Sequence, residues 1–414
     1  RTETRSFEAL PFREADALVL AQLSYDEVPE CVLLLDDLVA KYGTLQARAK
    51  QFDIRRPIAS LRMLRKPPFG GVTIARADDE LNHDKPVADH DVENVGLVDP
   101  QVTHDFYHAV AANPRFSDVE MSAYCEQFDG GAQTQFAAVT FRLPSGTLVV
   151  AFRGTDDSLV GWKEDFNMAF TPEIPAQRYA ADYLQQAAAA LAFRPLLVGG
   201  HSKGGNLAVY SAVFCGEAVQ NQLMRVYNND GPGFRTSLLG LPEHRRVADK
   251  ITTILPESSV VGMLLEHEER YEVVRSTQSG LWQHDGFSWQ VRGEKFEHLP
   301  DLTEGGKLVD ETIRTFILSL SPEQRVAFTD ALFDILTCTD AGTLTDLKEG
   351  GLKTAAAMLK KYRTLDKPTR SALGSTLRLF MAAGAKTAAS ELNPVSLLLR
   401  HLPLQKLADD LEKP

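Results

Sequence analysis

The 414-residue sequence has few cysteines, no long apolar run and no excess of positive charge. Its four cysteines lie far apart and form no Cys-x-x-Cys pair, which argues against a disulfide framework and indicates reduced thiols of an intracellular protein. No apolar stretch reaches the roughly 18 residues that a transmembrane helix needs. The net charge of -12 argues against a general nucleic-acid-binding protein.

The sequence also has no secretory signal pattern at its start, where it opens with Arg1. Together with the reduced cysteines, this absence predicts a cytoplasmic protein. The length exceeds that of a usual single domain, so we expect either two domains or one large domain with an appendage.

One short glycine-rich motif carries the most information. Residues 196–208 read LLVGGHSKGGNLA, in which Ser202 lies between Gly200 and Gly204 at the Gly-x-Ser-x-Gly spacing. The motif alone is weak evidence, because a glycine-rich turn of any parallel-sheet protein could match it. Here an apolar, strand-like run precedes it and a helical pattern follows, which is the context of a nucleophile elbow. We therefore predict that Ser202 is a catalytic nucleophile.

Strand and helix patterns alternate around this motif. Such alternation predicts an α/β fold with a mostly parallel sheet and helices on both faces. The helical patterns cover residues 15–25 and 176–193 and the segment after the elbow. The strand patterns cover residues 119–125, 134–142, 147–153, 195–198, 223–229, 250–255 and 270–275.

Two regions fall outside this alternation. Residues 66–100 are rich in Gly, Pro, Asp and His and predict a surface excursion; their His83 and His90 match no metal-binding spacing, so a polar loop is the simpler interpretation. From residue 305 to residue 414 the sequence is rich in Ala, Leu and Lys and predicts about four helices. We expect a main α/β domain at 1–304 and a C-terminal helical region at 305–414.

A serine nucleophile needs a base and an acid, which follow it along the chain in this fold class. His284 follows the last predicted strand, between two tryptophans and two glycines, and is the candidate base. Asp230 ends the strand after the elbow unit and is the preferred acid, although it could be a simple turn aspartate. Glu257, at the end of the next strand, is the alternative acid.

The oxyanion hole should combine the backbone N–H of Lys203 with a group from an earlier strand end. Thr155 follows the strand at 147–153 and offers a backbone N–H and a hydroxyl, although Arg153-Gly154-Thr155 could be a plain turn. The next segment, 157–170, mixes apolar and charged residues at near-helical spacing. Two interpretations remain open for it: a lid over the pocket, or a packed surface helix.

These motifs resemble those of class 3 (fungal-type) lipases and, more closely, an uncharacterised bacterial family of lipase-like α/β-hydrolases. Residues 149–155 and 200–204 carry the resemblance to class 3 lipases. Residues 18–25, 152–166, 230–234 and 283–285 carry the closer match, which covers roughly residues 10–300. It implies an α/β-hydrolase fold, with Ser202 as nucleophile, Thr155 in the oxyanion hole and His284 as base. One departure matters: in class 3 lipases the acid follows the later strand, where this sequence has Glu257 and no aspartate.

The sequence therefore predicts a serine hydrolase that cleaves carboxylic esters with a Ser202–His284–Asp230 triad and needs no metal or organic cofactor. The resemblance to lipases implies that acyl lipids could be among these ester substrates. The alternatives are a catalytically inactive hydrolase-fold scaffold that binds a partner, and a thioesterase or peptidase with the same triad. The sequence leaves the oligomeric state open.

Overall fold

The computed structural model describes residues 3–81, 100–156, 158–168, 171, 173–191, 195–265, 267, 271–304, 306–307, 321–339, 343, 351–371 and 373–374. Its centre is a sheet in the order β1-β2-β3-β4-β5-β6-β7-β8-β11. The strands are β1 (Val72–Thr73), β2 (Glu120–Asp129), β3 (Thr134–Arg142), β4 (Leu148–Phe152), β5 (Leu196–His201), β6 (Leu223–Asn229), β7 (Ile251–Pro256), β8 (Tyr271–Val274) and β11 (His298–Leu299).

The predicted parallel sheet is confirmed for the centre of the molecule, where β4 to β8 are parallel neighbours. The edges differ, because β1 to β4 pair antiparallel in sequence order and β11 pairs antiparallel with β8. The parallel strands all end on one side of the sheet, which is where α/β proteins carry their functional groups. A separate hairpin joins β9 (Val291–Arg292) to β10 (Lys295–Phe296).

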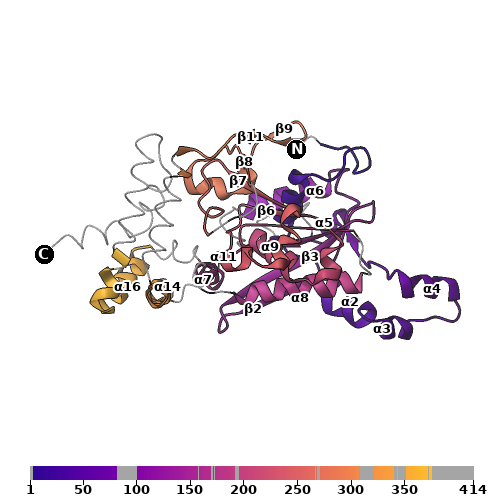
Figure 1. The fold of residues 1–414 in the computed structure, drawn as a ribbon, viewed down its shortest axis with the longest axis horizontal. Helices are drawn as coiled ribbons and strands as arrows, with labels where there is room; N and C mark the ends of the chain where they lie inside the picture. Colours follow the sequence, from indigo (N-terminus) through magenta and orange to yellow (C-terminus); the bar gives the residue numbers. More distant parts are fainter. Residues whose placement is uncertain are drawn as a thin grey trace.

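Helices cover both faces of the sheet (Figure 1). One face packs against α2 (Leu35–Tyr42), α8 (Pro175–Ala190) and α9 (Lys203–Phe214), and the other packs against α1 (Glu14–Leu23), α5 (Ile74–Leu81) and α6 (Pro100–Ala111). The shorter helices are α3 (Leu45–Lys50), α4 (Pro57–Arg65), α10 (Glu217–Gln220), α11 (Thr236–Leu239), α12 (Pro242–Arg245), η2 (Ala248–Lys250), η3 (Gly280–His284) and η4 (Gly286–Ser288).

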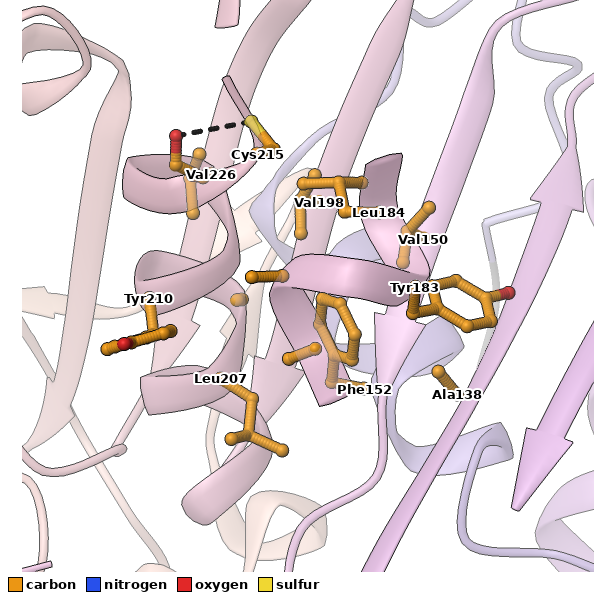
Figure 2. Packing of buried hydrophobic residues seen from close by; sticks show 14 of the residues in the cluster. Ala138, Val150, Phe152, Tyr183, Leu184, Val198, Leu207, Tyr210, Cys215 and Val226 are labelled. Atoms are coloured by element: carbon orange, nitrogen blue, oxygen red, sulfur yellow. Dashed lines mark hydrogen bonds between the residues drawn. The ribbon is translucent and has the colours of Figure 1, made fainter. Parts of the chain in front are cut away.

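Strand β4 shows how the sequence builds these two cores. Val150 and Phe152 point into the core under α8 and α9, whereas Val149 and Ala151 point into the core under α1 and α6. Successive side chains of a strand alternate between faces, so a fully apolar strand requires cover on both sides. Figure 2 shows the first of these cores, with Leu207 and Tyr210 of α9 packed beside the sheet.

The surface excursion predicted at 66–100 is wrong for its first part. Residues 72–81 form edge strand β1 and helix α5, whose Ile74 and Ala77 are fully buried. The surrounding Gly, Pro and Asp residues hid this short amphipathic pattern. Residues 82–99, with His83 and His90, lie outside the described part of the chain.

Two of the predicted C-terminal helices lie in the described residues, α14 (Pro322–Leu336) and α16 (Gly351–Thr364). They share a small apolar cluster with Leu159 of helix α7 (Leu159–Met168). The domain boundary at residue 305 stays a prediction. Within the described residues, no helix combines the length and apolarity needed to cross a bilayer.

Candidate functional site

Ser202 occupies a strained turn between β5 and α9. Its φ of 58° and ψ of -134° are unusual for a residue with a side chain, and such strain clusters at functional sites. A Cβ at Gly200 would collide with the backbone of Gly204, and one at Gly204 would collide with the carbonyl of Phe152. The two glycines are therefore required by the close approach of strand, turn and helix. The turn places Ser202 at the amino end of α9, where the helix dipole is positive.

Asp230 and His284 meet beside this turn. Nδ1 of His284 lies 2.6 Å from Oδ2 of Asp230, whose carboxylate is fully buried. The other carboxylate oxygen accepts hydrogen bonds from the hydroxyl of Ser259 and, at 3.2 Å, from the backbone N–H of Gly262. A buried carboxylate needs such donors, and here the loop after β7 supplies two of them.

Glu257 lies on the same loop but faces a different environment. Its backbone N–H donates to the carbonyl of Val274, and its carbonyl accepts from Thr303. Among the described residues, its carboxylate forms no hydrogen bond with the His284 ring. The histidine is thus bonded to the carboxylate that ends β6, while the loop after β7 contributes Ser259.

A second set of hydrogen bonds fixes the turn that carries Asp230. The amide of Asn206, on α9, donates to the carbonyls of Pro232 and Gly233 at 3.0 and 3.1 Å. Gln177 of α8 donates to the same Asn206 side chain at 2.9 Å. Because Asn206 lies one helical turn after the elbow, this network holds the Asp230 turn against the start of α9.

His201, the neighbour of Ser202, positions the loop that carries His284. Its Nε2 lies 2.7 Å from the backbone carbonyl of His284 and must therefore be the protonated nitrogen. Burial, reinforced by the nearby His284, lowers the pKa of His201 to about 3, so its ring is neutral over the physiological range. Its Nδ1 lies 3.3 Å from the hydroxyl of Tyr25, which also donates to the carbonyl of His201 at 3.2 Å.

Tyr25 connects the elbow to the predicted oxyanion loop. Its hydroxyl lies against the backbone of Gly154, where an added Cβ would collide with it. Burial raises the pKa of Tyr25, so the phenol stays protonated. One side chain from the end of α1 therefore fixes both the strand end before Thr155 and the residue before Ser202.

Lys203 contributes more than its backbone to this region. Its ammonium is fully buried and donates to the carbonyl and side-chain oxygens of Gln135, at 2.8 and 2.6 Å, and to Glu164 at 3.0 Å. Glu164 is also fully buried and accepts the backbone N–H groups of Gln135 and Ala176. The charge of Lys203 is thus neutralised by a carboxylate of α7.

Thr155 is linked to this buried charge through Asp165. Its hydroxyl donates to Asp165 at 2.5 Å, and the second oxygen of Asp165 lies 4.0 Å from the Lys203 ammonium. Burial raises the pKa of Asp165 to about 6, although Lys203 and Thr155 both oppose that shift. Above that pH, the hydroxyl proton of Thr155 is held by the carboxylate and its oxygen presents only lone pairs.

Comparison with known proteins identifies a family for this chain. Residues 110–334, more than half of the chain, match the model of a family described as Mbeg1-like. The chain belongs to the Mbeg1-like family. No curated protein matches it.

Two solved structures are similar to this Mbeg1-like chain. One is the lipase–propeptide complex of Rhizomucor miehei, with 18% identity over 39% of this chain and 58% of that one, and a TM-score of 0.29. The other is a mutant form of MDLA from Penicillium cyclopium, with 12% identity over 55% of this chain and 84% of that one, and a TM-score of 0.31. The chain thus spans less than two thirds of the first lipase.

Helix α7 of this Mbeg1-like protein is packed on both sides. Glu164 and Asp165 point into the site, whereas Lys163 forms an ion pair with Asp330 of α14 at 3.0 Å and Leu159 joins the C-terminal cluster. Moving α7 would separate the buried Lys203–Glu164 pair. Of the two interpretations of this segment, the structure favours the packed helix.

One group of side chains in the described residues has the geometry of a metal site, and it lies at the sheet edge formed by β8 and β11. The ligand atoms of Glu14, Glu272 and His298 all lie within 4.8 Å of one another. Both ring nitrogens of His298 already contact these carboxylates, at 2.8 and 3.3 Å. The group is therefore accounted for as an ion-pair cluster.

Sequence reasoning missed several residues of the site. His201 and Tyr25 lie within motifs that the sequence singled out, yet only three-dimensional proximity reveals that they touch. Glu164 and Asp165 belong to the matched segment 152–166, where acidic residues at near-helical spacing were the available signal. No sequence pattern pointed to Ser259, because serines are common in loops.

Proposed function

We propose that this protein is a serine hydrolase that cleaves carboxylic esters, with Ser202 as nucleophile, His284 as base and Asp230 as the acid that orients the base. The observation that supports the proposal most directly is the 2.6 Å hydrogen bond between His284 and the buried carboxylate of Asp230, next to a serine in a strained elbow. With Nδ1–H donated to Asp230, His284 presents the lone pair of Nε2 as the base.

The reaction would proceed through an acyl-enzyme. The Ser202 oxygen attacks the ester carbonyl while Nε2 of His284 takes its proton, and the resulting imidazolium is stabilised by Asp230. His284 then gives that proton to the departing alcohol. In the second half, His284 takes a proton from water, the hydroxide attacks the acyl group, and the proton returns to Ser202.

The oxyanion of each tetrahedral intermediate would accept hydrogen bonds from the backbone N–H groups of Lys203 and Thr155. The N–H of Lys203 is the first of α9 and has no partner within the helix. Since the hydroxyl of Thr155 donates to Asp165, its backbone N–H is the better donor when Asp165 is ionised. Loss of one such donor costs about 3–4 kcal/mol of transition-state stabilisation.

The substrate class is part of the proposal and rests on the resemblance of the sequence motifs to those of class 3 lipases. That resemblance favours esters with an apolar acyl chain, acyl lipids among them. A cytoplasmic location belongs to the proposal as well, and the four cysteines, all free thiols, support it.

Hydrolysis of p-nitrophenyl esters of increasing acyl length tests this proposal. The wild type should turn over at least one of these esters, and Ser202→Ala and His284→Ala should each lose at least about 10³-fold in kcat. The proposal is wrong if the Ser202→Ala variant hydrolyses these esters at the wild-type rate.

A further inference from the structure

Residues 45–66 project from the body of the protein and form what we call the basic arm. It consists of α3, α4 and the turn between them, and it extends away from the sheet in Figure 1. Arg48 holds the arm in place, because its guanidinium donates to the carbonyls of Tyr42, Leu64 and Ala189 at 2.7, 3.1 and 3.0 Å. These bonds join the arm to itself, to α2 and to the end of α8.

The arm exposes an unusual amount of apolar surface. Ile54 is 83% exposed and Ile58 is 68% exposed, and five of the twelve exposed large hydrophobic side chains in the described residues lie here. These five are Leu45, Phe52, Ile54, Ile58 and Leu61. Single exposed apolar residues need no explanation, but a cluster on a projecting element marks an interaction site.

The charge of the arm is opposite to that of the protein. Residues 45–66 carry seven lysines and arginines and one acid, Asp53, in a chain with a net charge of -12. Apart from Arg48, all of these cations are exposed, and within the described residues none of those six forms an ion pair. The six are Lys50, Arg55, Arg56, Arg62, Arg65 and Lys66. Their charge is therefore available to a partner.

Cationic and apolar groups lie side by side on α4. Ile58, Leu61, Arg62 and Arg65 are spaced by three or four residues and share one face of the helix. Exposed apolar side chains beside unpaired cations match the boundary of a lipid bilayer, where acyl chains lie under anionic headgroups. A nucleic acid would be complementary to the cations but not to Ile54 and Ile58.

We propose that the basic arm docks this protein on an anionic lipid surface. Ile54, Ile58 and Leu61 enter the boundary between headgroups and acyl chains, and the arginines beside them bind the lipid phosphates. The proposal does not depend on the serine chemistry, because the arm is anchored at the end of α8, before β5, whereas Ser202 follows β5. The two sites therefore lie at opposite ends of the parallel strands.

Co-sedimentation of the full chain with vesicles tests the docking. One set of vesicles is phosphatidylcholine alone, and the other contains about one third phosphatidylglycerol. The protein should sediment with the anionic vesicles and stay in solution with the neutral ones, and salt should weaken the binding. The double variant Arg55→Gln/Arg56→Gln should reduce partitioning about 30-fold, at about fivefold for each cation. Ile54→Ser/Ile58→Ser should reduce it at least about tenfold.

Matched substitutions outside the arm serve as controls. Met224→Ser/Val291→Ser removes two comparably exposed apolar side chains, and Arg292→Gln/Lys295→Gln removes two exposed cations. Both controls should bind like the wild type. Circular dichroism and hydrolysis of a soluble ester should be unchanged in the arm variants, which separates lost docking from lost folding and from any failure of the proposed catalysis.

Three outcomes would overturn the proposal. The first is no sedimentation with anionic vesicles, and the second is equal binding of the arm variants and the wild type. The third is self-association of the wild type in size-exclusion chromatography that the arm variants lose, without any binding to vesicles. This last result would assign the arm to a second, acidic copy of the chain.

Discussion

His284 donates its Nδ1–H to Asp230, which directly follows β6, and not to Glu257, which follows β7. The loop after β7 still takes part, because Ser259 and the N–H of Gly262 donate to the other oxygen of the same carboxylate. The two strand ends thus contribute complementary halves of one arrangement: the carboxylate from one, its hydrogen-bond donors from the other.

This geometry predicts which carboxylate matters for catalysis. Asp230→Asn should lower kcat by about 10⁴-fold, since the amide no longer stabilises the imidazolium or holds the correct tautomer. Glu257→Gln should change kcat less than about twofold, because its carboxylate forms no hydrogen bond with His284. Ester hydrolysis by the two purified variants distinguishes these expectations. An inactive Glu257→Gln variant beside an active Asp230→Asn variant would show that Glu257, not Asp230, is the acid of the triad.

The parallel centre of the sheet and the elbow could be predicted from the sequence, and the network around the site could not. The strands β3, β4, β6 and β7 were recognisable because their apolar runs are bounded by turn residues, and the elbow was recognisable because strain demands Gly200 and Gly204. The choice between Asp230 and Glu257 stayed open, because both end adjacent parallel strands. The pairing of Lys203 with Glu164 was hidden for another reason: a lysine beside a nucleophile looks exposed until the helix across from it is placed.

The buried Lys203–Glu164 pair should contribute measurably to the free energy of unfolding. Lys203→Met leaves Glu164 charged and without its cation, which should cost about 3–5 kcal/mol of unfolding free energy. The double variant Lys203→Met/Glu164→Gln should be more stable than Lys203→Met alone. Urea unfolding measures both, with Lys163→Met, which breaks a partly exposed pair with Asp330, as a control expected to lose less than about 1 kcal/mol. A double variant that loses the sum of the two single changes would argue against the pairing.

Asp165 should make stability depend on pH. Burial raises the pKa of its carboxyl from 3.8 to about 6, so the native state binds more protons than the unfolded state between these values. Its contribution is therefore full below pH 3.8 and is lost as the pH rises through 6. Asp165→Asn should match the wild type near pH 3.5 and be more stable at pH 8, by up to about 3 kcal/mol. Urea unfolding at both pH values checks this, and an equal difference at both would contradict it.

The Tyr25 hydroxyl should matter for both stability and turnover. Tyr25→Phe leaves the ring and the carbonyl of His201 without this partner, which should cost about 1–3 kcal/mol of stability. It should also lower kcat about tenfold with little change in KM, because the oxyanion loop and the His284 loop lose a shared support. Tyr183→Phe is the matched control: its buried hydroxyl contacts Thr140 and the carbonyl of Ala123, away from the site, so stability should fall and kcat should not. If both variants lower kcat equally, Tyr25 contributes to stability alone and does not position the site.

Covalent labelling of Ser202 with a fluorophosphonate probe tests the central claim most directly. Intact-mass and peptide analysis of the wild type should show one adduct, located on Ser202, and Ser202→Ala should remain unlabelled. Asp230→Asn should react much more slowly than Glu257→Gln. The account is contradicted if the wild type stays unlabelled under conditions that label a known esterase, or if Ser202→Ala is labelled to the same extent as the wild type.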